Sequence, residues 1–342
     1  MKGEPAGRVA RCLLATTLLT GLAACATSKS PSMLTPKGPA ARTIADIWWP
    51  MVWVATAVTI FVVVMGAYGV VRARRVREED IERHVPWGDR FILIAGLGVT
   101  GAILVGFFVY SVARAATLAH AKSGVEIHIT GHDWWWEVTY PNGAVTANEI
   151  HIPAGQRVNL TLTSVDVIHS FWVPELGPKI DLIPGRTTHT WIEADHAGEF
   201  RGQCFEYCGL QHAHMAFFVV ADPPAQFAQW MNNMALPADK PSSALAAAGE
   251  NVFMSNTCIG CHAIRGTPAS GQLGPDLTHM ATRQMIAAGT IPLTASTLAD
   301  WITNPDRFKP GVVMPPTTLT SEELTALVTY LLSLGFPGGP AR

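Results

Sequence analysis

One stretch decides how this chain folds and what it binds: Cys204-Phe-Glu206-Tyr-Cys208-Gly-Leu-Gln-His212-Ala-His214-Met215. It places two thiols, imidazole and a thioether within twelve residues of one loop. Thiolate and thioether ligands select soft metals such as copper, and imidazole binds copper as well. A mononuclear copper site uses one cysteine, whereas two cysteines at positions i and i+4 can both bridge a pair of metal ions. The stretch therefore predicts a dinuclear copper site.

A pair of copper ions needs a second imidazole from outside this loop. His169 is the best candidate, because it follows a strand-like run and is expected on a rigid sheet edge. Within the loop His214 is an alternative to His212, but the spacing to Met215 favours His212. A tetrahedral zinc site built from the same cysteines and histidines is the competing interpretation.

The segments on either side of the loop have the alternation of β-strands. Apolar residues occupy every second position from Val125 to Ile129 and again from Val158 to Leu162. Residues typical of turns separate the strand-like runs, at Pro141-Asn142-Gly143 and at Pro184-Gly185. Short strands at regular spacing predict an antiparallel sandwich or barrel, which we assign to residues 124–230.

The N-terminal residues 1–25 have the pattern of a secretory signal. Three basic residues precede an apolar stretch that ends at Ala24, and this order is typical of exported proteins. The segment Leu22-Ala23-Ala24-Cys25 resembles a bacterial lipoprotein box, so we expect lipidation at Cys25. Ordinary cleavage that leaves Cys25 free, or an uncleaved anchor, are the alternatives.

Two uncharged apolar runs predict a transmembrane hairpin within residues 44–114. Residues 47–71 and 91–113 are each long enough to cross a hydrocarbon core of roughly 30 Å as a helix. The loop between them carries six arginines: Arg72, Arg74, Arg75, Arg77, Arg83 and Arg90. By the positive-inside rule this loop is cytoplasmic, and everything after Arg114 lies outside the cytoplasm. We therefore expect a multi-pass protein of the bacterial inner membrane, in contact with lipid, with its soluble domains on the periplasmic side.

Charge is spread unevenly along the chain. Residues 121–230 carry 5 Lys/Arg against 12 Asp/Glu, whereas residues 1–120 carry 13 against 7. An acidic middle domain argues against a nucleic-acid partner and could steer a basic protein instead. Four acidic residues near the metal loop could form such a docking patch: Asp166, Glu175, Asp181 and Asp195.

The last third of the chain carries a signature of covalent haem. After a predicted linker at residues 231–243, a helix-like segment leads into Cys258-Ile-Gly-Cys261-His262. In C-x-x-C-H motifs the cysteines bind the porphyrin edge, and the histidine binds the iron. The other axial ligand should be a methionine downstream. Three methionines compete for this role: Met280, Met285 and Met314.

Residues 124–222 resemble the soluble domain of cytochrome c oxidase subunit II, which has a cupredoxin fold and a dinuclear copper centre called CuA. The family pattern Cys-x-Glu-x-Cys-x3-His-x2-Met begins at Cys204, and Asp-x-Ile-His-Ser begins at Asp166. Residues 179–186, Lys-Ile-Asp-Leu-Ile-Pro-Gly-Arg, match as well. The resemblance implies a ligand set: Cys204 and Cys208 as bridges, His169 and His212 on one copper each, and Met215 and the Glu206 carbonyl as weak axial ligands.

The same resemblance implies further roles. The Glu206 side chain would face a magnesium or manganese ion shared with subunit I. An aromatic cluster in the family takes electrons from cytochrome c, and Trp134 is the matching position, although Asp133 stands where the family more often has Gln. A glutamate before the second helix opens a proton path in the family. Three residues are candidates here: Glu78, Glu79 and Glu82.

Residues 244–336 resemble class I cytochromes c, which are all-α. Lys309-Pro-Gly-Val-Val-Met314-Pro-Pro is similar to the loop that carries the methionine ligand, so the resemblance favours Met314. Gly274-Pro275 is similar to the segment whose carbonyl accepts the Nδ1 proton of the proximal histidine, here His262. A capping box that starts at Thr320 predicts a final helix over residues 322–334.

The two resemblances imply subunit II of a haem–copper terminal oxidase, at which electrons enter the complex. Cytochrome c would reduce haem c, then CuA, and then the oxygen-reducing subunit I of a proton-pumping complex that also contains subunit III. A membrane-tethered electron carrier outside an oxidase is the main alternative. A quinol oxidase subunit would lack the copper ligands. A nitrous-oxide-reductase-like protein would need a large catalytic domain, and a copper-delivery protein would need no covalent haem.

Overall fold

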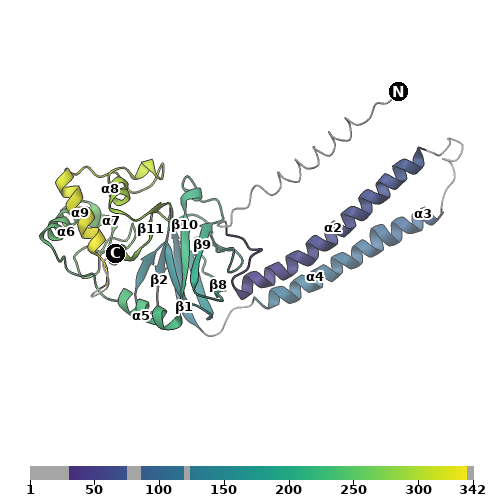
Figure 1. Cartoon of the computed structure of the whole chain (residues 1–342), viewed down its shortest axis with the longest axis horizontal. Helices are drawn as coiled ribbons and strands as arrows, with labels where there is room; N and C mark the ends of the chain where they lie inside the picture. The colour runs from purple at the N-terminus through teal and green to yellow at the C-terminus, as the bar shows by residue number, and fades with distance from the viewer. Residues whose placement is uncertain (1–30, 75–85, 119–123, 337–342) are drawn as a thin grey trace, which may run out of the picture.

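The computed structural model describes residues 31–74, 86–118 and 124–336. The predicted signal with Cys25, and the three glutamates proposed for a proton path, lie outside these residues. The described chain forms a helical hairpin, a β-sandwich and a helical domain in that order, with the sandwich in the middle (Figure 1). This order confirms the predicted multidomain fold class.

The hairpin consists of two long antiparallel helices. The first is α2 (Pro39–Ala73), and the second runs without a break through α3 (Pro86–Phe91), the π-helical segment η2 (Ile92–Val99) and α4 (Thr100–Ala116). Both are long and apolar enough to cross a membrane, and none of the most apolar window in either is buried inside the protein. Tyr110 donates a hydrogen bond to the carbonyl oxygen of Asp46 at 3.1 Å, and Arg114 pairs with the Asp46 carboxylate. These contacts join the ends of the helices nearest the sandwich.

Helix α2 begins at Pro39 instead of Ile47, where the predicted apolar run starts. Its first turns pack against the sandwich, because the backbone N–H of Ala41 donates to Leu176 at 3.3 Å and Ala40 and Ala41 are fully buried. Arg42 forms a bidentate pair with Asp195. The hairpin is therefore held against the sandwich by the N-terminal turns of α2.

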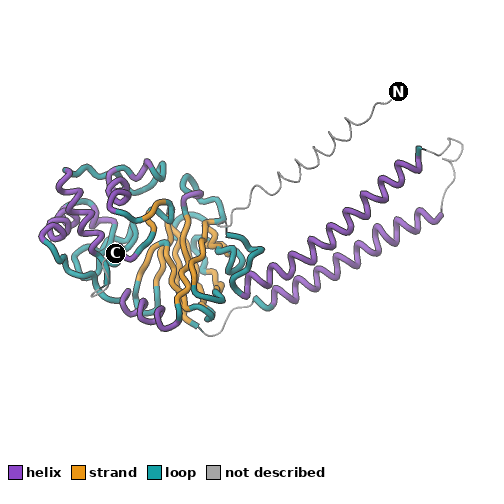
Figure 2. Tube along the Cα trace, viewed as in Figure 1, coloured by secondary structure: helices purple, strands orange, loops and turns teal. Residues whose placement is uncertain are grey.

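The sandwich is built from two five-stranded sheets. The first has the order β3 (Val145–Ala147), β2 (Trp135–Thr139), β1 (Val125–His132), β5 (Val158–Ser164) and β8 (Thr188–Ile192). The second has the order β4 (Glu149–Pro153), β10 (Ala216–Asp222), β9 (Gly198–Cys204), β6 (His169–Trp172) and β7 (Ile180–Leu182). Figure 2 shows these strands packed as a single block between the helical parts.

The predicted sandwich is confirmed, but two of its strand pairs are parallel instead of antiparallel. Strand β1 pairs with β5 in parallel, with Ile127 opposite Leu160, and β10 pairs with β4 in parallel. Alternation places apolar residues on one face of a strand but carries no information about its direction. The predicted faces are correct, because Ile127, Ile129, Leu160 and Leu162 are at most 1% exposed in the core between the sheets.

Helix α5 (Pro224–Met234) follows β10 and covers part of the sandwich. The predicted linker over 231–243 is shorter in the structure, because residues 231–234 form the last turn of α5. Phe227 and Met234, seven residues apart, are both 4% exposed and lie in the sandwich core cluster. Residues on one helix face recur at this spacing, so packing against the core extends the helix through two asparagines.

The C-terminal domain is mainly helical. Its elements are α6 (Ala244–Ser255), α7 (Cys258–Cys261), η4 (Met280–Thr282), β11 (Met285–Ile286), β12 (Ile291–Pro292), α8 (Ala295–Thr303), η5 (Pro305–Arg307) and α9 (Ser321–Ser333). Helices α6 and α9 cross closely at Gly249, where an added Cβ would lie 2.0 Å from the carbonyl oxygen of Ala326. The predicted capping box of the last helix is confirmed: Thr320 accepts from the Glu323 N–H, and the Glu323 side chain accepts from the Thr320 N–H.

Candidate copper and haem sites

The cysteine loop connects two neighbouring antiparallel strands. Strand β9 ends at Cys204, the short helix η3 (His212–His214) follows, and β10 begins directly after Met215. The N–H of Cys204 donates to the carbonyl oxygen of Met215 at 2.9 Å and closes the loop. His169 begins strand β6, which pairs with β9. Sheet pairing thus brings His169 to the loop across 35 residues of sequence.

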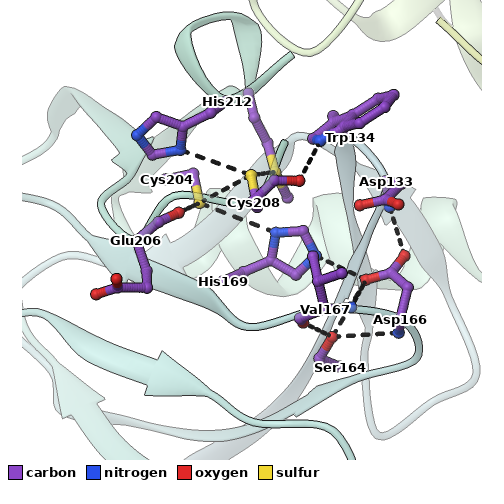
Figure 3. Close-up of polar contacts among 11 residues, drawn as sticks. Asp133, Trp134, Ser164, Asp166, Val167, His169, Cys204, Glu206, Cys208 and His212 are labelled. Atoms are coloured by element: carbon purple, nitrogen blue, oxygen red, sulfur yellow. Dashed lines mark hydrogen bonds and ion pairs between the residues drawn. The ribbon is translucent and has the colours of Figure 1, made fainter. Parts of the chain in front are cut away.

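The predicted sulfur and imidazole ligands converge in the structure (Figure 3). The Sγ atoms of Cys204 and Cys208 are 3.7 Å apart, and both thiols are free. His169 Nδ1 lies 3.9 Å from the Cys204 sulfur, and His212 Nδ1 lies 3.6 Å from the Cys208 sulfur. Each cysteine therefore faces one imidazole, which matches a symmetric pair of metal positions.

The two weaker predicted ligands lie at opposite sides of the sulfur pair. Met215 Sδ is 3.8 Å from the Cys208 sulfur and is fully buried. The carbonyl oxygen of Glu206 is 3.3 Å from the Cys204 sulfur, whereas the Glu206 carboxylate points away and lies 3.3 Å from Lys179 Nζ (Figure 3). His214 contacts Gln211 Oε1 at 3.0 Å instead of a sulfur, so the geometry favours His212 over His214.

The protonation of the two thiols fits a bound metal. The hydrogen bond from Cys208, with a further contact from His169, lowers the pKa of Cys204 to about 4. The contact with Cys204 and burial raise the pKa of Cys208. The pair thus loses one proton readily, but the second leaves only if positive charge is added nearby. Thiolate ligands coordinate as anions, so metal bound to both sulfurs would supply that charge.

Glycine makes room for one of the imidazoles. An added Cβ at Gly131, in strand β1, would lie 2.7 Å from Cδ2 of His169. Such a distance is well inside van der Waals contact, so only glycine allows the ring to lie against the sheet here. His169 is completely buried, and its ligand atom and those of Cys204 and Cys208 all lie within 4.8 Å of one another.

The predicted electron-accepting tryptophan touches the cysteine loop. Trp134 Nε1 donates to the carbonyl oxygen of Cys208 at 2.6 Å, and Trp134 is partly buried against the sandwich core. The Asp133 N–H donates to Asp166 Oδ2 at 2.6 Å. Three of the four carboxylates considered as a docking patch have contacts within the chain: Asp166 with His169, Asp181 with Lys179 and Asp195 with Arg42. The docking patch itself stays a prediction.

His262, the histidine of the haem motif, has the orientation and the protonation state of a metal ligand. Its Nδ1 lies 2.7 Å from the carbonyl oxygen of Pro275, which leaves Nε2 available. Burial lowers the pKa of His262, so the ring is neutral, the form that coordinates iron. A Cβ at Gly274 would lie 2.6 Å from Cε1 of this ring. Cys258 and Cys261 are free and half-buried, as thiols that must reach a porphyrin edge should be.

The three candidate methionines lie in different surroundings. Met280 is 4% exposed inside the C-terminal core, and Met285 begins strand β11. Met314 lies in a loop before α9 and is only partly buried against the same core. A side chain on a loop at the core edge is free to reach a bound group, which supports Met314.

Sequence reasoning missed Lys309 as a site residue. Its side chain is 3% exposed, and Nζ donates to the carbonyl oxygen of Trp134 at 3.0 Å. The signal was a lysine immediately before Pro310-Gly311, in the same loop as Met314. Only the packing of the helical domain on the sandwich shows what this lysine contacts.

Comparisons with known proteins agree with this architecture. Residues 144–222 match the family model of the cytochrome c oxidase subunit II periplasmic domain, and residues 246–335 match that of cytochrome c. Cytochrome c oxidase subunit 2 of Alkalihalophilus pseudofirmus is 35% identical, over 93% of this chain and 94% of its own length. The subunit 2 of Bacillus sp. PS3 is 35% identical over 62% of this chain and 63% of its own. A quinol oxidase subunit 2 of Bacillus cereus is 29% identical over 67% of this chain and 80% of its own.

A crystal structure of the periplasmic domain of subunit II of cytochrome oxidase (CoxB) of Bradyrhizobium japonicum is also similar. It is 33% identical, and the match covers 33% of this chain and 94% of that one, with a TM-score of 0.32. Fold, sites and relatives together define a membrane-anchored electron-transfer protein of a respiratory oxidase, with its soluble domains on the periplasmic side. The chain belongs to the cytochrome c oxidase subunit 2 family and carries a cytochrome c domain.

Proposed function

We propose that this subunit receives electrons from a periplasmic cytochrome c on its own haem c and passes them, through a dinuclear CuA centre, to subunit I. The observation that carries the proposal is the convergence of the cysteine sulfurs with an imidazole on each, at 3.9 Å from Cys204 and 3.6 Å from Cys208. Copper held there would take up one electron shared over two ions. The oxygen-reducing site would lie in subunit I.

The chain's own residues limit movement at the copper site. Cys204 and Cys208 would bridge, His169 and His212 would bind one copper each through Nδ1, and Met215 and the Glu206 carbonyl would be weak axial ligands. The loop is anchored at both ends by strands β9 and β10, and its sulfurs are buried. A rigid ligand set changes little in geometry when the charge changes, which favours fast electron transfer.

A haem would be held by His262 and Met314 at its iron and by Cys258 and Cys261 as covalent links. The Pro275 carbonyl holds the His262 ring through Nδ1, 2.7 Å away, and fixes which nitrogen faces the iron. Second-shell contacts of this kind orient metal-binding histidines in general. The C-x-x-C-H motif is the observation that supports covalent attachment.

The remaining roles follow the family resemblance. The Glu206 carboxylate, which is turned away from the sulfurs, would face a magnesium or manganese ion shared with subunit I. The hairpin would pack against subunit I, with subunit III in the same proton-pumping complex. Residues 1–25 would be removed as a signal, and Cys25 would be lipidated.

Electron paramagnetic resonance of the purified full-length subunit tests this function. A mixed-valence signal split by two equivalent copper nuclei is expected, together with the low-spin spectrum of a histidine–methionine haem. A signal from a single copper, or no copper uptake, would contradict the CuA assignment and leave a tethered cytochrome. Oxygen consumption with reduced cytochrome c by the assembled complex tests the oxidase role separately.

A further inference from the structure

The C-terminal domain contacts the sandwich directly above the copper loop. Lys309 Nζ donates to the Trp134 carbonyl oxygen at 3.0 Å, and the Gln211 side-chain amide donates to the carbonyl oxygen of Pro310. A Cβ on Gly311 would lie 2.9 Å from Cδ1 of Leu210, so the two loops touch closely. Lys309 and Gln211 are 3% and 2% exposed. The loop that carries Met314 therefore lies against the loop that carries the copper ligands.

Other contacts that do not involve Lys309 also join the two domains. The Ala216 N–H donates to the carbonyl oxygen of Ala288 at 3.0 Å, and Ala288 is buried against Trp135. Arg265 donates to the carbonyl oxygen of Gly143 at 3.0 Å. These contacts do not depend on the Lys309 side chain, so we expect its loss to change only the local placement of the Met314 loop.

Burial of the Lys309 ammonium group has a desolvation cost that a purely structural contact would not need. No carboxylate lies within 4 Å of its ammonium group in the described parts of the chain. Burial lowers its pKa to about 8. An apolar side chain would fill the same space without the desolvation cost of a buried cation. What the ammonium adds is a directed hydrogen bond to one backbone carbonyl.

The carbonyl oxygen that accepts from Lys309 belongs to Trp134, and the side chain of Trp134 contacts the copper loop. The Trp134 indole donates to the Cys208 carbonyl oxygen at 2.6 Å. Lys309, Trp134 and Cys208 therefore form a continuous series of contacts from the Met314 loop to a bridging cysteine. We propose that Lys309 is a positioning residue that holds the Met314 loop on Trp134, so that Trp134 relays electrons inside the chain, from the cytochrome c domain to the copper site.

This proposal rests on the proposed function for its two redox sites. One electron, supplied by an external reduced donor, leaves the cytochrome c domain and arrives at the copper site, and no covalent bond forms or breaks. External donors would then meet the cytochrome c domain.

The test uses the full-length subunit in its assembled complex with the variants Lys309→Met and Lys309→Arg. A photochemical reductant reduces the haem, and the rate of transfer from haem to copper is followed optically. We expect a roughly tenfold slower transfer in Lys309→Met, since one charge-assisted hydrogen bond is lost from the docked loop, and partial recovery in Lys309→Arg. The rate of haem reduction, the haem spectrum and the copper resonance signal should not change.

Lys240→Met is the matched control, because Lys240 is an exposed lysine that precedes α6, the first helix of the same domain. It should transfer electrons at the rate of the unmodified protein. Transfer at the unmodified rate in Lys309→Met, with both spectra intact, would overturn the proposal. Absence of the dinuclear copper signal in the unmodified protein would refute the proposed function instead.

A second measurement needs neither metal nor activity. Amine acetylation of the folded full-length subunit, read by mass spectrometry, should modify Lys240 and spare Lys309 until the protein is unfolded. Equal modification of the two lysines in the folded protein would show that the Met314 loop does not lie on Trp134, and would refute the role of Lys309 even if the variants fail to fold.

Discussion

His169 Nε2 lies 2.8 Å from Asp166 Oδ1, and this contact decides which nitrogen of the imidazole faces the sulfurs. With Nε2 held by the carboxylate, Nδ1 is directed to Cys204. Asp166 is itself fixed, because it accepts hydrogen bonds from the backbone N–H groups of Asp133 and Val167. A buried ligand is therefore oriented by a carboxylate that two backbone donors hold in place.

Asp166→Asn should weaken copper binding by roughly 10- to 100-fold, the usual effect of losing an outer-shell partner of a metal-binding histidine. The amide removes the negative charge and turns an N–H₂ group toward a backbone donor. Competition with a copper chelator measures the affinity. Asp239→Asn, in the segment before α6, is the control and should bind copper normally; a normal affinity for Asp166→Asn would refute this role.

Gly131→Ala should abolish the dinuclear copper signal, because its Cβ would lie 2.7 Å from the His169 ring and must displace it. Gly198→Ala is a matched control in strand β9, where the nearest atom to an added Cβ is an ordinary contact at 3.6 Å. Resonance spectra of the two copper-loaded proteins give the comparison. An unaltered signal from Gly131→Ala would show that His169 does not bind copper in this position.

Gly274→Ala should disturb the haem site in the same steric way. The new methyl group would lie 2.6 Å from Cε1 of His262 and would break the 2.7 Å contact between Nδ1 and Pro275. We expect less covalent haem and loss of the low-spin absorption spectrum. Gly335→Ala adds a methyl group with nothing within 4 Å and should leave the spectrum unchanged. A normal spectrum in both variants would contradict His262 as the proximal ligand.

The two carboxylates that contact His151 should make the stability of the sandwich depend on pH. Burial disfavours its charged form, but hydrogen bonds to Asp222 at 2.7 Å and Glu149 at 3.0 Å outweigh burial and raise its pKa above 6.5. The stabilisation is complete below pH 6.5 and is lost as the pH rises through the higher folded-state value. His151→Gln should therefore destabilise the protein by about 3 kcal/mol at pH 6 and by less at pH 9.

Chemical unfolding followed by tryptophan fluorescence at both pH values measures this difference. His128 is exposed, so His128→Gln is the control and should unfold like the unmodified protein at each pH. An equal loss of stability at pH 6 and pH 9 in His151→Gln would mean that the charge on this imidazole makes no contribution.

Local patterns in the sequence determined a large part of this protein. The cysteine loop and the C-x-x-C-H motif each lie within one short segment, so their spacing alone identifies the groups that can bind copper and haem. Apolar runs and alternation identified the hairpin and the buried faces of β1 and β5, because periodicity reports which face of an element avoids water. The start of the last helix followed from the capping box at Thr320.

Tertiary structure decided the relationships between distant segments. It made β1 and β5 parallel, lengthened α2 through its contacts with the sandwich, and brought His169 to the cysteines from 35 residues away. It also placed Lys309 on Trp134 across 175 residues. Periodicity and motifs act over a few residues, whereas these contacts depend on which surfaces pack together, and that is settled only when the whole chain buries its apolar area.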